Sequence, residues 1–271
     1  MVLSVITTKE NDYSEGSLLV SSFHKIGLST DESSKLRLLL ASKSPRRREI
    51  LDMMGLVGRY TVKPSPLNEE ELQIELANKN FSPQEYARTL AERKAHAMGV
   101  LMGTAMPNSG EVTIIIGSDT IVDLDGTIME KPKNEGDAFN MLRRLSGNVH
   151  QVHSGVAAYA VGAGLQNNEK LMFSFTDTAR VKFATLTDDD IMAYIDTNEP
   201  FDKAGSYGIQ GVGGQFGEYV WIVVLLITSA NNASYSSSAV ERMEGDFFTV
   251  MGLPMHRLSK ELSLAIRSLS I

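Results

Sequence analysis

From Leu36 onward, apolar residues occur in two patterns, short continuous runs typical of strands and spacings of three to four residues typical of helices. The apolar run that ends at Leu40 is typical of a buried strand, and apolar residues then recur at helical spacing over 50–54. Ser44 suits the N-cap of that helix because its hydroxyl can accept from a free backbone N–H, and Pro45 suits the first helical position. We therefore expect a strand that is followed directly by a helix.

The same patterns predict the elements farther along the chain. Residues 82–85 have the capping-box pattern, in which a Ser and a Glu satisfy free N–H groups at a helix start, so a helix should extend to about residue 102. The β-branched run at 112–116 is typical of a buried strand, which we expect to break at Gly117, and Asp125-Gly126 predicts a hairpin turn. The remaining expected elements are a helix over 134–145, long strands over 150–161 and 171–186, a short helix over 187–196, a strand over 245–254 and a final amphipathic helix over 255–269.

The order of these elements indicates a fold class. Strands and helices are interleaved, which is typical of an α/β protein, but two successive hairpins intrude and make the expected sheet mixed. The 271 residues suffice for one large domain or two small ones. Within residues 1–35 charged residues precede any apolar run, so this segment does not resemble a signal peptide, and we expect a flexible N-terminal extension.

Composition narrows the function classes. The formal net charge of −7 argues against a general nucleic-acid-binding protein, whose surface would be basic. The absence of cysteine excludes a disulfide framework, a thiolate zinc site and a Cys nucleophile, and it fits a cytoplasmic location. The longest apolar run, 219–227, is far shorter than the roughly 18 residues of a membrane span, so we expect no membrane partner.

Three consecutive arginines, Arg46, Arg47 and Arg48, fall in the first turn of the first predicted helix. A cation there lies beside the positive end of the helix dipole, which is usually unfavourable by about 0.3–1 kcal/mol. Two interpretations remain open from this stretch alone. Either the arginines point into water and pair with nearby acids, or an anionic ligand binds where helix N–H groups and guanidinium groups converge.

Three further clusters are candidates for chemistry. Asp119 directly follows an apolar strand and a glycine, which favours the carboxyl edge of a sheet, where ligands bind; a turn-capping Asp is the alternative. Lys131 precedes a proline that keeps the backbone extended, so it can reach a phosphate, although a solvated lysine has the same pattern. The five glycines within 205–214 allow close backbone approach to a ligand, but the Lys-Ser/Thr of a phosphate-binding P-loop is missing.

Two other patterns are weaker. Residues 123–127 match the short nucleophile motif of haloacid-dehalogenase-type phosphatases, but the apolar alternation around them indicates a hairpin rather than the strand end that this chemistry needs. His150 and His153 are three positions apart on a predicted strand, which places them on opposite faces and argues against a shared metal.

Together these clusters resemble one family. The segments "LASKSPRRREIL", "IIIGSDTIVDLDGTIMEKPKNEGDAFNMLRRLSG", "PFDKAGSYGIQGVGG" and "GDFFTVMGLP" are similar to the Maf family of nucleotide pyrophosphatases over about residues 36–217 and 241–270. The resemblance implies an elongated α/β fold, a mixed twisted β-sheet flanked by helices with a central active-site cleft, that is often dimeric. It also implies hydrolysis of a nucleoside triphosphate to the monophosphate and pyrophosphate with a divalent metal, Mg²⁺, Mn²⁺ or Co²⁺.

The resemblance also implies roles for individual residues. Asp119 matches the proton acceptor and a metal ligand, and Glu69 matches a second acidic metal position. The identities at the positions that set base preference resemble the dTTP/UTP branch rather than the 7-methyl-GTP branch. The matching substrate-binding residues are Ser44, Arg46, Arg47, Lys94 and Lys131 for the phosphates, and Arg46, Thr120 and Gln210 for the base.

The chain departs from the family pattern after Gly217. An apolar run and a Ser/Asn/Ala-rich stretch form an atypical insert at about 218–240, inside a domain that otherwise extends over 36–271. The expected function is hydrolysis of pyrimidine nucleoside triphosphates for the housekeeping of nucleotide pools. The alternative is a nucleotide-binding regulatory protein of cell division without significant catalysis, and the set of Arg, Lys and Asp positions favours the enzyme.

Overall fold

The computed structural model describes residues 35–103, 111–162, 165, 168–215 and 240–269. The extension expected over 1–35 and the insert expected at about 218–240 therefore fall almost wholly outside the described residues. No helix within the described ranges is long and apolar enough to cross a membrane.

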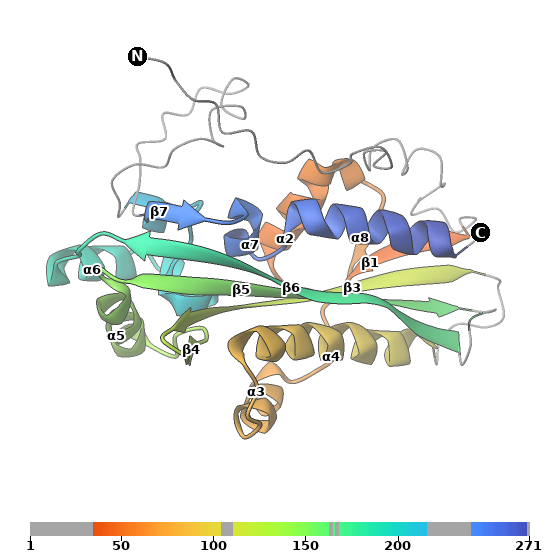
Figure 1. Cartoon of the computed structure of the whole chain (residues 1–271), viewed down its shortest axis with the longest axis horizontal. Helices are drawn as coiled ribbons and strands as arrows, with labels where there is room; N and C mark the ends of the chain where they lie inside the picture. The colour runs from red at the N-terminus through yellow and green to blue at the C-terminus, as the bar shows by residue number, and fades with distance from the viewer. Residues whose placement is uncertain (1–34, 104–110, 163–164, 166–167, 216–239, 270–271) are drawn as a thin grey trace, which may run out of the picture.

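A mixed sheet of seven strands extends along the length of the molecule (Figure 1). Its strand order is β2-β1-β3-β5-β6-β7, with β4 paired to β3 outside that path. The pairs β1–β2 and β1–β3 are parallel, whereas the other pairs are antiparallel, which confirms the expected mixed α/β sheet. The strands are β1 (Leu36–Leu40), β2 (Thr61–Val62), β3 (Val112–Leu124), β4 (Thr127–Met129), β5 (Val149–Gly162), β6 (Glu169–Phe183) and β7 (Val240–Glu244).

Helices cover both faces of this sheet. In Figure 1 the long α4 lies along one face, with the shorter α3 on the same side beyond it, and α2, α7 and α8 lie on the other side of the sheet. The helices α5 and α6 lie near one end of the long strands (Figure 1). The bounds are α2 (Pro45–Leu51), α3 (Glu69–Ala77), α4 (Pro83–Gly103), α5 (Glu135–Leu145), α6 (Asp188–Ile195), α7 (Phe247–Met251) and α8 (Met255–Ser268), with short turns η1 (Asp52–Leu56), η3 (Glu199–Asp202), η4 (Ala204–Ser206) and η5 (Val212–Gln215).

The local signals at several helix and strand ends are confirmed. The Ser82 N–H donates to Glu85 Oε2 at 3.0 Å and the Glu85 N–H donates to Ser82 Oγ at 3.3 Å, which is the reciprocal pattern of a capping box. The side chain of Asn134 caps α5 and that of Thr187 caps α6. Asp125 and Gly126 have φ values of 52° and 81° in the turn between β3 and β4, as the predicted hairpin requires.

Two sequence predictions are wrong at glycines. The strand does not break at Gly117, because β3 continues to Leu124. A Cβ at Gly117 would lie 2.4 Å from the carbonyl oxygen of Ala91, so this glycine lets α4 pack directly on the strand. The strand expected over 245–254 is the helix α7, which Asp246 caps at its start and Gly252, with φ 114°, ends in the left-handed region. Apolar periodicity over so few residues does not distinguish a helix from a strand.

Two apolar cores lie at the two ends of β3. The first packs the start of β3 against β1, α2 and α8 through residues such as Leu40, Ile116 and Leu258. The second packs the end of β3 against α5 and α6 through residues such as Val122 and Leu142. Residues 117–121 lie between them, and this middle of β3 carries the candidate site.

Candidate active site

One edge of β3 is open at the site. The pairing with β1 ends at Ile116 and the pairing with β4 begins at Val122, so on this side residues 117–121 face no strand of the described chain. Asp119 is therefore not at the end of its own strand, as expected, but in the middle of it. It lies instead beyond the carboxyl end of the parallel neighbour β1, which is where α/β sheets bind ligands.

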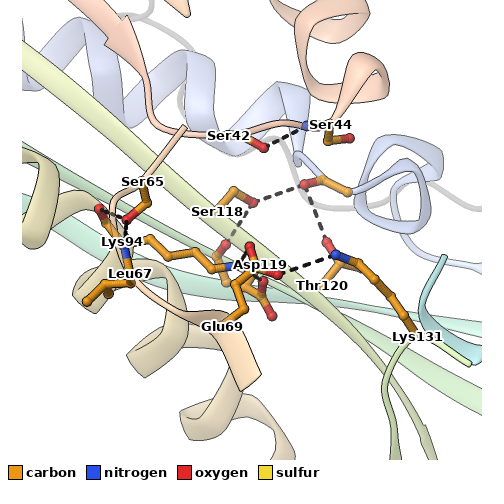
Figure 2. A network of polar contacts seen from close by, with 12 residues as sticks. Ser42, Ser44, Ser65, Leu67, Glu69, Lys94, Ser118, Asp119, Thr120 and Lys131 are labelled. Carbon is orange, nitrogen blue, oxygen red and sulfur yellow. Dashed lines mark hydrogen bonds and ion pairs between the residues drawn. The ribbon is translucent and has the colours of Figure 1, made fainter. Parts of the chain in front are cut away.

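Two carboxylates meet at one buried lysine (Figure 2). Lys94 projects from α4, is 4% exposed, and its ammonium contacts the carboxylate of Asp119. The same ammonium lies 2.9 Å from Glu69 Oε1, at the start of α3. The Lys131 ammonium reaches the other oxygen of Glu69 at 3.4 Å. Four residues that are far apart in the sequence thus form an alternating chain of charges.

These neighbours shift the pKa values of the cluster. Burial lowers the pKa of Lys94, but the charges of Asp119 and Glu69 outweigh burial, and the pKa is raised overall. Burial likewise raises the pKa of Glu69, yet the charges of Lys94 and Lys131 outweigh it and lower the pKa to about 2. Both side chains therefore stay charged at neutral pH.

Arg47 ties three segments together on the other face of β3. Its Nε donates to the carbonyl oxygen of Gly252 at 2.9 Å, Nη1 to Ser42 Oγ at 3.1 Å and Nη2 to Thr120 Oγ1 at 3.2 Å. Burial lowers its pKa, and the negative charge of Asp119 opposes that shift. The segment that was expected as a strand thus supplies, through Gly252, a carbonyl that orients the arginine.

The other two arginines have different surroundings. The Arg46 guanidinium turns toward η3, where Nη1 lies 3.1 Å from Asp202 Oδ2 and Nη2 donates to the Asp202 carbonyl oxygen at 3.3 Å. Arg48 is exposed. Ser44 occupies the N-cap position as expected, but its side chain makes no capping hydrogen bond, so the N-cap expectation holds for the backbone alone.

The glycine-rich segment holds Gln210 and approaches the protein itself. A Cβ at Gly211 would lie 2.3 Å from Glu199 Oε1, and a Cβ at Gly213 would lie 2.5 Å from the Tyr194 hydroxyl oxygen. These two glycines therefore pack closely on Glu199 and Tyr194, and the predicted approach of this segment to a ligand stays a prediction. Gln210 is half-buried, and its Oε1 is buried without a hydrogen-bond partner among the described residues.

The sequence interpretation missed three residues that belong to the site. Burial, followed by the charge of Asp119, raises the pKa of Glu130 to about 8, and the Tyr86 side chain hydrogen bonds to this carboxyl. Ser42 Oγ accepts from the Ser44 N–H at 3.1 Å and so fixes the start of α2. Ser118 Oγ donates to the carbonyl oxygen of Gly252 at 3.0 Å. All three residues lie within the sequence motifs described above. Their roles become visible only when the folded chain brings distant segments together.

The two weaker patterns are structural. Asp123 lies within β3, and its Oδ2 is 3.6 Å from His153 Nε2. His153 Nδ1 pairs with Thr178 Oγ1 at 2.8 Å, whereas His150 Nε2 pairs with the Tyr207 hydroxyl at 2.8 Å. The described residues contain no group of three or more His, Cys, Asp or Glu side chains that could together hold a metal ion. A cation at this site would need oxygen atoms from a ligand beside those of Glu69 and Asp119.

The arrangement suits an anionic ligand whose reaction also needs a carboxylate as a base. Lys131 follows β4 and contacts Glu69, Lys94 contacts both carboxylates, and Arg46 and Arg47 come from the first turn of α2. Such a site can bind several negative charges and still present a base to a water molecule.

Comparison with known proteins adds to this geometry. The model of the "Maf-like protein" family matches residues 37–220. A dTTP/UTP pyrophosphatase of Bacillus pumilus (strain SAFR-032) is 38% identical over 226 residues, which cover 83% of this chain and 95% of that protein. One of Carboxydothermus hydrogenoformans is 35% identical over 227 residues, 84% of this chain and 97% of that protein. A human protein called "Probable bifunctional dTTP/UTP pyrophosphatase/methyltransferase protein" is 34% identical over 226 residues, 83% of this chain and 31% of its own length.

Proposed function

The chain belongs to the Maf family, and we propose that it hydrolyses dTTP and UTP, or modified pyrimidine nucleotides, to the nucleoside monophosphate and pyrophosphate. The observation that carries the proposal is the meeting of Asp119 and Glu69 at Lys94 on the open edge of β3. The curated relatives with the names given above support the same reaction.

The triphosphate binds through cations that come from separate segments. Lys131 and the first turn of α2, with Ser44, Arg46 and Arg47, supply point charges and planar donor groups that match phosphate oxygens. Arg47 is already oriented by three hydrogen bonds, so little side-chain entropy is lost when its remaining donors bind the ligand.

Asp119 acts on the water. A water molecule attacks the α-phosphorus, its proton passes to the Asp119 carboxylate, and the bond from the α-phosphorus to the bridging oxygen breaks as pyrophosphate leaves. The leaving pyrophosphate gains negative charge, which Lys94, held by two carboxylates, and the exposed Lys131 stabilise. Lys94 contacts Asp119 directly, and so it also holds the carboxylate in place.

The same carboxylates fit a divalent cation. Asp119 and Glu69 lie close together because both contact the Lys94 ammonium, and Mg²⁺ is usually bound by one or two carboxylates together with substrate phosphates. Glu69 and Asp119 would hold the ion, which supplies charge stabilisation at the phosphates when it is bound. The choice among Mg²⁺, Mn²⁺ and Co²⁺ stays a prediction.

Base preference depends on Gln210, together with Thr120 and Arg46. The buried Oε1 of Gln210 is an acceptor without a partner in the described chain, and the N3–H of thymine or uracil is a donor that can satisfy it. The amide –NH₂ group can donate to a neighbouring carbonyl of the same base. A paired amide–base contact of this kind favours pyrimidines with two carbonyl groups.

A screen of nucleotides tests the proposed function. The protein with Mg²⁺, Mn²⁺ or Co²⁺ is incubated with canonical and modified triphosphates, and both pyrophosphate and orthophosphate are measured. We expect pyrophosphate from dTTP and UTP, and no release after the metal is chelated. Orthophosphate as the single product would favour a phosphatase, and nucleotide binding without release under any metal would favour the regulatory protein of cell division.

The three arginines should not be equivalent. Arg48→Glu reverses an exposed charge in the first turn of α2, where an acid suits the helix dipole, so we expect activity within about twofold of wild type and unchanged or slightly higher stability. Arg46→Glu removes a predicted phosphate ligand and should abolish measurable nucleotide binding. Titration calorimetry with a nonhydrolysable triphosphate measures both variants, and equal losses in both would remove Arg46 from its role.

Three further parts of the proposal concern partners and location. We propose a cytoplasmic protein that binds neither nucleic acid nor membranes and that can form a homodimer. Sedimentation of the purified chain measures the oligomeric state directly.

A further inference from the structure

A carboxylate of the chain itself occupies the centre of the glycine-rich loop 208–214. Glu199 Oε2 accepts from the Val212 N–H at 2.6 Å, and Oε1 accepts from the Gly213 N–H at 3.4 Å. The Tyr194 hydroxyl donates to Glu199 Oε1 at 3.1 Å. Three donors thus converge on two carboxylate oxygens, and the glycines leave no room for a side chain between loop and carboxylate.

The same pair of side chains holds the loop on both sides of Gln210. On one side the Gly208 N–H donates to the Tyr194 hydroxyl oxygen at 3.1 Å. On the other side the Val212 N–H is bound to Glu199, as described. Tyr194 is 1% exposed on α6, so this anchor is itself rigidly packed. Gln210 therefore lies in a short loop segment, 208–212, whose two ends are hydrogen-bonded to Tyr194 and Glu199.

The turn that carries Glu199 has independent support at its other end. Lys203 Nζ donates to the Glu199 carbonyl oxygen and to Asp202 Oδ1, each at 2.6 Å. Arg46 holds Asp202 from α2 through the contacts given above. The backbone of η3 is thus fixed without the side chain of Glu199, and loss of that side chain's bonds should release the loop while the turn stays in place.

We propose that Glu199, supported by Tyr194, is the positioning residue that sets the geometry of Gln210 for base recognition. The inference rests on the proposed role of Gln210 and deepens it. Glu199 does not touch the substrate; it acts through the loop backbone. Removal of its charge should weaken recognition of the base without changing the phosphate site or the Asp119–Lys94 pair, which lie on other elements.

Glu199→Gln is the discriminating variant. It keeps the size of the side chain, but its –NH₂ group then faces backbone N–H donors, so one of the three donors loses its acceptor. We expect an affinity for α,β-imido-dUTP at least about tenfold lower by calorimetry, because a hydrogen bond to a charged group is lost. Affinity for tripolyphosphate, which has no base, should stay within about twofold, since Arg46 and Lys131 are unaffected.

Kinetics give a second readout. The ratio of kcat/KM for dTTP to that for dGTP should fall by about tenfold in Glu199→Gln, while kcat for dTTP changes less than about threefold. Asp196→Asn, an exposed acid three positions earlier, is the matched control and should behave as wild type. Tyr194→Phe removes the hydroxyl from the same anchor and decides the question if Glu199→Gln does not fold.

Several results would overturn the inference. Unchanged affinity for the imido analogue in both variants would do so, and so would an equal loss of tripolyphosphate affinity, since that would show general disruption. The binding measurements do not need hydrolysis. If the wild type binds the analogue but releases no pyrophosphate, the proposed function fails while the role of Glu199 is still decided; if the wild type binds no analogue, both fail.

Discussion

Asp119→Asn is expected to lower kcat for dTTP by about 10³-fold, within the usual range for loss of a positioned general base. Asparagine has nearly the same shape as aspartate, but it cannot accept the proton of the attacking water. The phosphate-binding cations are on other elements, so KM and the affinity for a nonhydrolysable triphosphate should change little at saturating metal, although the metal concentration needed should rise because Asp119 is also a proposed metal ligand. Pyrophosphate release and calorimetry on the same preparation measure the two quantities.

The control for this variant lies on the same hairpin. Asp125→Asn changes an exposed acid in the turn after β3, where φ is 52° and asparagine is well tolerated, so activity should match wild type. Circular dichroism and thermal unfolding confirm that Asp119→Asn is folded. Turnover above about a tenth of the wild-type rate would exclude Asp119 as the base.

Lys94→Met is expected to lower the free energy of unfolding by about 3–5 kcal/mol, the usual cost of removing one partner from a buried ion pair. Methionine fills a similar volume but leaves Asp119 without its ammonium partner and Glu69 with Lys131 alone. Activity should fall with stability, because the carboxylate that receives the proton is no longer held. Denaturant unfolding at pH 7 without metal gives the first quantity and pyrophosphate release gives the second.

The pH dependence of this variant has a definite sign. Lys94 and Lys131 lower the pKa of Glu69 to about 2, against burial, and loss of Lys94 lets burial and the nearby carboxylate raise it. An acid whose pKa is higher in the folded than in the unfolded state favours folding as pH falls, so the deficit of Lys94→Met should shrink between pH 7 and pH 5. Mg²⁺ should stabilise the variant more than the wild type.

A surface lysine provides the comparison. Lys79→Met removes an exposed pair with Glu75 on α3, and such pairs contribute about 0–1 kcal/mol. Its stability should therefore fall by no more than about 1 kcal/mol and should show no special response to pH or Mg²⁺. A similar small loss in Lys94→Met would contradict the proposed electrostatic role.

Local signals predicted much of the fold because they act within a few residues. The capping box at Ser82, the Asn134 and Thr187 caps and the turn at Asp125 each depend on neighbours along the chain, and all are confirmed. The two wrong elements have another origin. The apolar run at 112–116 continues past Gly117 because α4 packs on it, and that contact joins residues far apart in the sequence.

The candidate site shows the same division. The residue types, their order in four motifs and the family came from the sequence, because phosphate chemistry needs cations beside a carboxylate whatever the packing. The edge of β3 is unpaired near Asp119 because β1 stops before this point and β4 pairs only after it. The residues around Asp119 in the sequence do not predict this gap. Tertiary packing separates Arg46, which faces Asp202, from Arg47, which binds Gly252, because both partners come from segments far from α2 in the sequence.

The sequence by itself thus determined which groups are candidates to bind the proposed polyanionic ligand and which local elements carry them. Only the tertiary structure decided that Lys94 joins Asp119 to Glu69, that Glu130 lies beside them, and that the glycines near Gln210 close around Glu199. The physical reason is range. Caps and turns depend on interactions between residues that are neighbours in the sequence. Burial and charge pairing depend on which distant segments pack together in the protein interior.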